Sequence, residues 1–79
     1  MKTRVYVTLK NGVLDPQGQA VQRSLARLGF GEAKDVRIGK YIEVRLDGTP
    51  ADARQRLDEM CRRLLANTVI EDYRYELSE

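Results

Sequence analysis

The residue types that commonly perform catalysis are scarce in this 79-residue chain and poorly spaced where they occur. Histidine, the most frequent general base near neutral pH, is absent. Ser24 falls on the apolar stripe of an expected helix and has no visible base to activate it. Asp58 and Glu59 are adjacent on a second expected helix, so their carboxylates point in different directions. The sequence therefore predicts no catalytic residue on this chain.

Metal and phosphate sites are also poorly supported. Cys61 is the only cysteine, so the chain cannot form an internal disulfide and lacks the ligands of a structural zinc. Its position between Met60 and Leu64 on an apolar stripe indicates a small core side chain. The Gly-Phe-Gly run at 29–31 follows a helix instead of preceding one, and the Gly-Lys pair at 39–40 lacks the rest of a P-loop. We expect neither a metal nor a cofactor on this chain.

The composition is 42% hydrophobic and 33% charged, with a net charge of +2, which is typical of a globular protein. A domain this short buries only about 60% of its unfolded surface, so oligomerisation is the expected source of further burial. No apolar run approaches the roughly 20 residues of a membrane span, and the first residues lack the apolar block of a signal peptide. We therefore expect one domain over residues 1–79, a cytoplasmic location and no membrane contact.

The first part of the chain predicts a strand followed by a helix. Residues 4–10 alternate apolar and polar side chains, with Val5, Val7 and Leu9 on the expected core face. Asp15 then supplies an N-cap acceptor before a proline at the first helical position, and Gly29 is suited to follow the helix end. The stripe expected to face the core comprises Ala20, Val21, Leu25 and Leu28.

The last part of the chain predicts a second helix followed by a strand. Thr49 and Pro50 predict a second helix start, and Asn67 is suited to end that helix in the left-handed conformation. The stripe expected to be buried comprises Ala53, Leu57, Met60, Cys61 and Leu64. Residues 69–77 predict a final strand. Its core-facing side chains are expected to be Val69, Tyr73, Tyr75 and Leu77.

The middle segment, residues 35–47, determines the topology. Its apolar residues all have even numbers: Val36, Ile38, Ile42, Val44 and Leu46. A two-residue hairpin at 39–40 would reverse the face of the second apolar set, so it is disfavoured. Either a three-residue loop joins two strands, or one long bent strand reaches a partner subunit. Both forms give an α+β fold with ferredoxin-like β-α-β(-β)-α-β order, an antiparallel sheet and two helices on one face.

Such a sheet would leave its second face open. The side chains expected there are Tyr6, Thr8, Arg37, Tyr41, Glu43 and Arg45. Tyrosine and arginine are enriched at protein interfaces, because each joins a broad apolar or planar body to a polar tip. The open face is therefore the first candidate for a subunit interface.

Three segments carry the most distinctive sequence patterns: LDPQG at 14–18, DVRIGKY at 35–41 and LLANTVIEDYRYE at 64–76. All three closely resemble the corresponding segments of the PurS subunits of phosphoribosylformylglycinamidine synthase. They stand in the same order and at the same spacing as in that family, so the resemblance spans the whole chain.

This resemblance implies a non-catalytic role in the fourth step of de novo purine synthesis. In that step a PurQ-type glutaminase subunit releases ammonia, and a PurL-type ATP-dependent synthetase subunit inserts it into formylglycinamide ribonucleotide. PurS-type subunits are implied to form homodimers or larger assemblies, to bridge the two enzymes and to support ammonia transfer. The resemblance also implies that ATP, Mg and glutamine are used by the partner subunits.

Subunit contacts are expected at exposed residues of the family-like segments, since the fold alone does not require charge there. Combined with the open face, these make nine predicted interface residues: Tyr6, Arg37, Lys40, Tyr41, Glu43, Arg45, Glu71, Asp72 and Arg74.

Two other functions share this topology. For an RNA-recognition module, residues 37–44 offer a basic-glycine-aromatic pattern, but the spaced stacking aromatics are missing and Glu43 would repel phosphate. An ACT-type module would bind a small ligand at a dimer seam, yet no convergent polar cluster is visible. We therefore expect no nucleic-acid partner.

Overall fold

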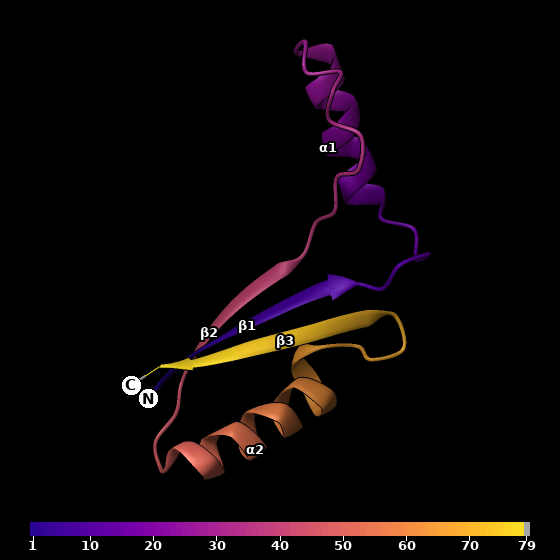
Figure 1. Ribbon diagram of the computed structural model, residues 1–79. Helices are drawn as coiled ribbons and strands as arrows, with labels where there is room; N and C mark the ends of the chain where they lie inside the picture. Colours follow the sequence, from indigo (N-terminus) through magenta and orange to yellow (C-terminus); the bar gives the residue numbers. More distant parts are fainter. Residues whose placement is uncertain (79) are drawn as a thin grey trace.

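The computed structural model describes residues 1–78, so Glu79, the last residue of the predicted domain, lies outside the described part. The elements, in chain order, are β1 (Lys2–Leu9), α1 (Pro16–Arg27), β2 (Lys40–Arg45), α2 (Pro50–Met60), the π-helical turn η1 (Cys61–Leu65) and β3 (Glu71–Ser78) (Figure 1). The strands form an antiparallel sheet in the order β2-β1-β3. The α+β class, the antiparallel sheet and the ferredoxin-like element order are confirmed.

The hydrophobic core lies between this sheet and α2. Val5 and Val7 of β1 are fully buried and pack with Leu57, Cys61 and Ala66. The partly buried side chains around this cluster include Ile42, Leu46, Met60, Leu65, Tyr73, Tyr75 and Leu77. The prediction that Cys61 is a small core side chain is confirmed, and burial raises the pKa of its thiol, with the nearby Asp58 carboxylate adding to the effect.

The helix starts are also confirmed. The Gly18 amide donates to Asp15 Oδ1 at 2.8 Å, and the Asp52 amide donates to Thr49 Oγ1 at 3.3 Å. Each bond satisfies one of the amides that a helix start leaves without a partner. Gly29 follows the end of α1 with a φ of +98°, which is a left-handed conformation that glycine adopts without steric cost.

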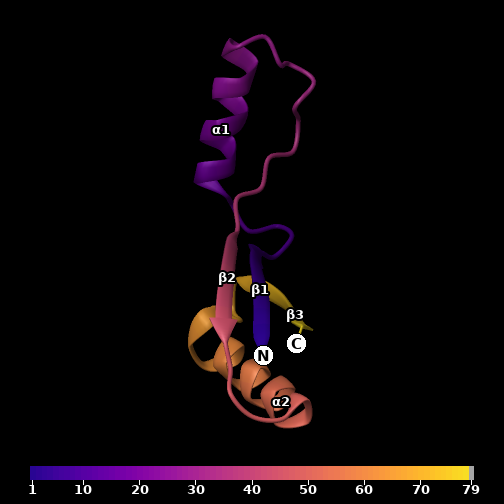
Figure 2. The same ribbon diagram turned by 90° about the vertical axis from the view of Figure 1, so that its left-hand side faces the viewer.

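The middle segment contains one strand within the described residues, and it is shorter than the long strand considered above. Only Lys40–Arg45 pairs with β1, while residues 33–39 form no regular structure. These residues run back beside α1 before entering the sheet (Figures 1 and 2). The form with two strands joined by a loop is therefore wrong. The form with one strand is correct in that a single strand is present, but this strand covers only Lys40–Arg45 and not the whole segment.

The prediction that both helices cover one sheet face is wrong for α1. Together, α1 and the returning segment project beyond the end of the sheet (Figure 2). On the stripe predicted to be buried, Val21 is 38% exposed and Leu28 is 72% exposed. A radius of gyration of 15.9 Å is well above the roughly 12 Å of a compact chain of this length. We call residues 11–39 the arm and the sheet with α2 and η1 the body.

The end of α2 also differs from the predicted stripe. From Cys61 the helix widens into a π turn, in which the Ala66 amide donates to the Cys61 carbonyl at 2.9 Å. The wider turn changes the phase of the side chains, so Leu64 is 82% exposed while Leu65 and Ala66 turn toward the core. A stripe drawn with a constant α-helical period could not show this shift.

The approach to β3 requires two further corrections. Val69 is 81% exposed because it lies in the turn before the strand. Among residues 1–78 no residue other than glycine has a positive φ, so Asn67 does not end the helix in the left-handed conformation. Its side chain instead accepts a hydrogen bond from the Val69 amide at 3.2 Å.

Candidate subunit interfaces

The arm joins the body at a neck, where the two family-like segments 14–18 and 35–41 meet. Asp15 lies at its centre and is only 8% exposed. Its two carboxylate oxygens accept from the amides of Gly18 and Ile38, each at 2.8 Å. These amides, Ile38 first, hold the pKa of the Asp15 carboxyl below its usual range, although burial acts in the opposite direction. One carboxylate thus fixes both the start of α1 and the return of the chain toward β2.

Two glycines make the close approaches at the neck. A Cβ on Gly18 would overlap the carbonyl oxygen of Val36, and one on Gly39 would lie 2.5 Å from the carbonyl oxygen of Val7. Both obstacles are backbone atoms, which cannot move aside as a flexible side chain would. The two backbone segments can pack this tightly only because neither glycine carries a side chain.

Three of the predicted interface residues belong to this neck and not to the open face. Arg37 precedes β2, and its guanidinium donates to the carbonyls of Leu9 and Lys10 at 2.6 and 3.1 Å. Lys40 and Glu71 lie on opposite edge strands, on the sheet face that carries α2, with Nζ and Oε2 3.9 Å apart. The expectation that Arg37 lines the open face is therefore wrong, because position 37 is not part of the sheet.

The other six lie together on the open face, across all three strands. Tyr6 of β1 is paired with Tyr41 of β2 and with Arg74 of β3. The two rings are 5.3 Å apart between centroids, and the Arg74 guanidinium lies 4.0 Å above the Tyr6 ring. Partial burial, together with the Glu76 carboxylate, raises the pKa of the Tyr6 hydroxyl. This row of aromatic and guanidinium groups is the type of surface that anchors protein interfaces.

Charges of both signs surround the row. Glu43 pairs with Lys2 at 3.3 Å, and Glu76 pairs with Arg74 at 3.2 Å. Asp72 lies 4.0 Å from Lys10, and Arg45 lies opposite Lys2 in the register. Exposed ion pairs such as these contribute little to the stability of a fold. They can instead select the partner and the orientation in which it binds.

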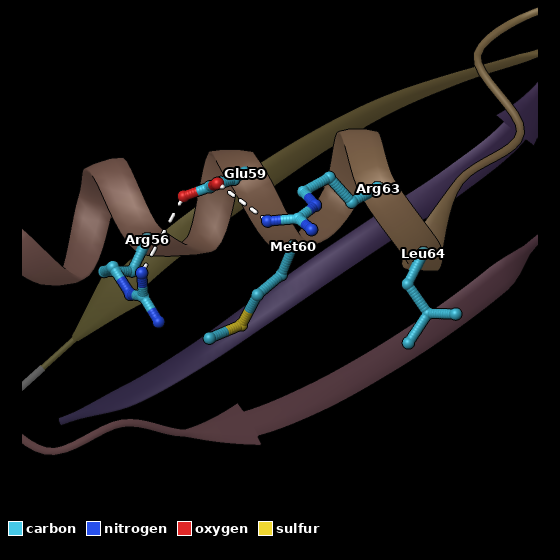
Figure 3. A pocket seen from close by; sticks show the side chains of 5 residues that line it. All are labelled: Arg56, Glu59, Met60, Arg63 and Leu64. Atoms are coloured by element: carbon cyan, nitrogen blue, oxygen red, sulfur yellow. Dashed lines mark hydrogen bonds and ion pairs between the residues drawn. The ribbon is translucent and has the colours of Figure 1, made fainter.

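The predicted interface residues include no exposed aliphatic side chain and not Phe30. Four exposed apolar side chains lie on the arm and are 38–72% exposed: Leu14, Val21, Leu28 and Phe30. A second apolar site lies beside α2 and η1, where Met60 and Leu64 extend toward β2 and a hollow of about 230 Å³ is lined by Arg56, Glu59, Met60, Arg63 and Leu64 (Figure 3). The amphipathic stripes were visible in the sequence, but their exposure depends on tertiary placement.

Two further properties concern the described residues alone. No helix within residues 1–78 is long and apolar enough to cross a membrane. In the same part of the chain, no group of three or more acidic or cysteine side chains is placed to hold a metal ion.

Known proteins share both the sequence and this arrangement. Residues 2–79 match the family described as PurS, phosphoribosylformylglycinamidine (FGAM) synthase. The FGAM synthase subunit PurS of Bacillus subtilis is 55% identical over 78 residues, covering 99% of this chain and 93% of that protein. A crystal structure of B. subtilis PurS superimposes with a TM-score of 0.90 over 99% of this chain and 98% of that one.

Two more distant structures are also similar. PurS of Methanocaldococcus jannaschii, named as one of the subunits of formylglycinamide ribonucleotide amidotransferase in the purine biosynthetic pathway, is 38% identical with a TM-score of 0.88. The match covers 99% of this chain and 95% of that one. A chain in the structure of PurLQS from Thermotoga maritima is 26% identical with a TM-score of 0.78, covering 95% of this chain and 93% of that one.

Proposed function

The chain belongs to the PurS family of subunits of phosphoribosylformylglycinamidine synthase, an enzyme of purine biosynthesis, and we propose that it is the assembly subunit of that complex. In this role it contacts a PurL-type synthetase and a PurQ-type glutaminase, and it works as a homodimer or larger oligomer. Residues 1–79 act as one PurS-like domain in the cytoplasm. ATP, Mg and glutamine are used by the partner subunits.

The observation that carries this proposal is the open-face row of Tyr6, Tyr41 and Arg74. It presents interface-type side chains on a sheet face that no element of the described chain covers. The similarity to a chain of the PurLQS structure supports partners of the PurL and PurQ types. We assign the six open-face residues to contacts with these partners. Arg37, Lys40 and Glu71 are assigned to contacts near the neck.

A bridging subunit has a clear chemical purpose here. Ammonia released at one active site is partly protonated at neutral pH and escapes into water, so it must pass to the second site through an aligned and sealed interface. A rigid chain without a catalytic site can hold the two active sites in that alignment. The ammonia then reaches the second site before it is lost to water, so the chain helps the reaction through proximity.

Reconstitution of the complex tests this role. Glutamine-dependent synthesis by the PurL-type and PurQ-type subunits should rise sharply when this chain is added, whereas ammonia-dependent synthesis should depend on it much less. The variant Arg74→Glu should weaken the stimulation, and Arg62→Glu, an exposed change on η1, serves as the matched control. Full glutamine-dependent activity without this chain would contradict the proposal.

A further inference from the structure

The turn between β1 and α1 carries a reactive pair of residues, Asn11 and Gly12. The Val13 amide donates to the Lys10 carbonyl at 3.1 Å, and Gly12 has a φ of +87°, which is typical of the third position of a type II turn. Both residues of the pair are exposed, and the connection from β1 to α1 swings out to one side of the neck (Figure 1). The pair is therefore open to water, on the first of the two chain segments that join the body to the arm.

An asparagine followed by glycine can modify itself without an enzyme. The Gly12 nitrogen, once it has lost its proton to water, attacks Cγ of the Asn11 side chain. A bond forms between these two atoms, the bond from Cγ to the side-chain nitrogen breaks, and this nitrogen takes up a proton and leaves as ammonia. One water molecule then opens the resulting five-membered succinimide ring. Opening at one carbonyl gives aspartate, and opening at the other gives isoaspartate, in which the main chain runs through the former side chain.

The structure favours this reaction at Asn11. Gly12 has no side chain to hinder ring closure, and a Cβ built there would meet no atom within 4 Å. Within residues 1–78, neither the Asn11 side chain nor the Gly12 amide takes part in a hydrogen bond. The single bond from Val13 to Lys10 closes the turn, so a small local opening lets the Asn11 side chain swing over the Gly12 nitrogen.

The second asparagine of the chain, Asn67, lies in the opposite kind of surroundings. It is followed by Thr68, whose branched Cβ crowds the attacking nitrogen. The Asn67 side-chain oxygen accepts from the Val69 amide at 3.2 Å, and the Asn67 amide donates to Glu71 Oε1 at 2.7 Å. The same reaction at Asn67 would have to break the bond to its side chain and overcome the crowding by Thr68. One asparagine is thus exposed to the reaction and the other is protected from it.

We propose that Asn11 is a site of spontaneous modification, at which the side-chain amide is lost as ammonia and aspartate or isoaspartate forms at the base of the arm. Either product adds one carboxylate, so the net charge falls from +2 to +1. Isoaspartate also lengthens the main chain by one methylene group between Lys10 and Val13. The Arg37 guanidinium donates to the Lys10 carbonyl at 3.1 Å, so this change loosens the turn next to the neck. The modification requires water and no partner subunit, so it is independent of the proposed function.

Ageing of the purified chain tests the site. The chain is kept in warm, mildly alkaline buffer, and peptides that contain positions 11 and 67 are followed by mass spectrometry, which detects the exchange of an amide for an acid. Conversion should be at least about tenfold faster at Asn11 than at Asn67, because glycine leaves the attacking nitrogen open and threonine crowds it. Asn11→Gln is the matched control. Its longer side chain would have to close a six-membered ring, so position 11 should stay unconverted.

Two results of this experiment would overturn the proposal. One is a smaller preference for Asn11 over Asn67. The other is conversion in the folded chain that is more than about tenfold slower than in a free peptide with the sequence of residues 8–15, since the turn would then protect the pair. Asp47 and Gly48 do not interfere, because isomerisation of an aspartate leaves the mass unchanged.

Hydrogen exchange tests the effect on the turn. In the separated isoaspartate form, the Val13 amide should exchange at least about tenfold faster than in the fresh chain, because its bond to the Lys10 carbonyl is lost. The variant Asn11→Asp carries the same added charge on a normal main chain, and its Val13 amide should exchange within about twofold of the fresh chain. Equal exchange in the isoaspartate form and in this variant would overturn the loosening of the turn. None of these measurements uses the PurL-type or PurQ-type subunits, so their failure would leave the proposed function standing.

Discussion

The body and the arm are held in place by different forces. Each hydrophobic residue that is buried in the described chain belongs to the body, where Val5, Val7 and Leu57 are inaccessible to solvent. In the arm, the buried positions are Asp15 and Gly18, which act through hydrogen bonds and close backbone contact. The body is thus stabilised mainly by the hydrophobic effect, whereas the arm is oriented by a small polar neck. Separate variants can therefore disturb stability and orientation independently.

The largest effect is expected from removing core volume in the body. Leu57→Ala deletes most of a fully buried side chain, so it should lower the free energy of unfolding by about 3 kcal/mol. Urea unfolding at fixed protein concentration measures the loss. Val69→Ala, at a position that is 81% exposed, should change the same quantity by less than about 0.5 kcal/mol. Equal losses for the two variants would show that burial of Leu57 does not stabilise the body.

A smaller effect is expected from crowding the neck. Gly18→Ala places a Cβ against the Val36 carbonyl, which should cost about 2 kcal/mol and speed hydrogen exchange of the Ile38 amide. Gly31→Ala is the matched control, since a Cβ there meets no atom within 4 Å. Unchanged exchange at Ile38 in Gly18→Ala would mean that the neck does not hold the arm.

The charge of Asp15 should make the neck sensitive to acid. Its folded pKa is lowered, so the stabilisation is complete above the unfolded value of about 4 and is lost as the pH falls through the folded value. Asp15→Asn keeps only one acceptor oxygen. It should lower Tm by about 5 °C at pH 7. It should also make the fall in Tm between pH 7 and pH 3 smaller than in the wild-type protein, because the variant has no carboxylate at this position to protonate. Identical pH profiles for the two proteins would contradict this assignment.

The smallest effect on stability is expected on the open face. Arg74→Glu removes the guanidinium from the Tyr6 ring, but Arg74 is exposed and the ring stays in place, so Tm should change by less than about 2 °C. Binding to the PurL-type subunit, measured by calorimetry, should weaken at the same time. A large loss of Tm with unchanged binding would assign Arg74 to the fold instead of the interface.

Local features of the fold could be predicted from the sequence because they depend on neighbouring residues. Asp15 and Thr49 mark helix starts through bonds within three residues, and the alternation around Val5 and Val7 identifies the central strand. The position of α1 could not be predicted in this way. An amphipathic stripe shows that a helix packs against something apolar, but not whether that surface belongs to the same chain.

The candidate interface residues divide in the same way, into those placed by a local pattern and those placed by contacts distant in sequence. The six open-face residues follow from strand parity, so their shared face could be predicted once the strands were assigned. Arg37 was misplaced because the start of β2 at Lys40 is decided by pairing with Val7, a contact distant in sequence. The exposure of Leu64 depends on a π turn, for which the residues 61–65 give no local indication.

The order of the strands has a consequence for how the protein is made. β1 is synthesised before every other element, yet its neighbours in the sheet come much later, and Lys2 pairs with Ser78. Translation proceeds at about 5–20 residues per second, so Val5 and Val7 remain without their full set of partners for several seconds on the ribosome. Among the described strands, the most buried one is therefore the one that waits longest for its partners during synthesis.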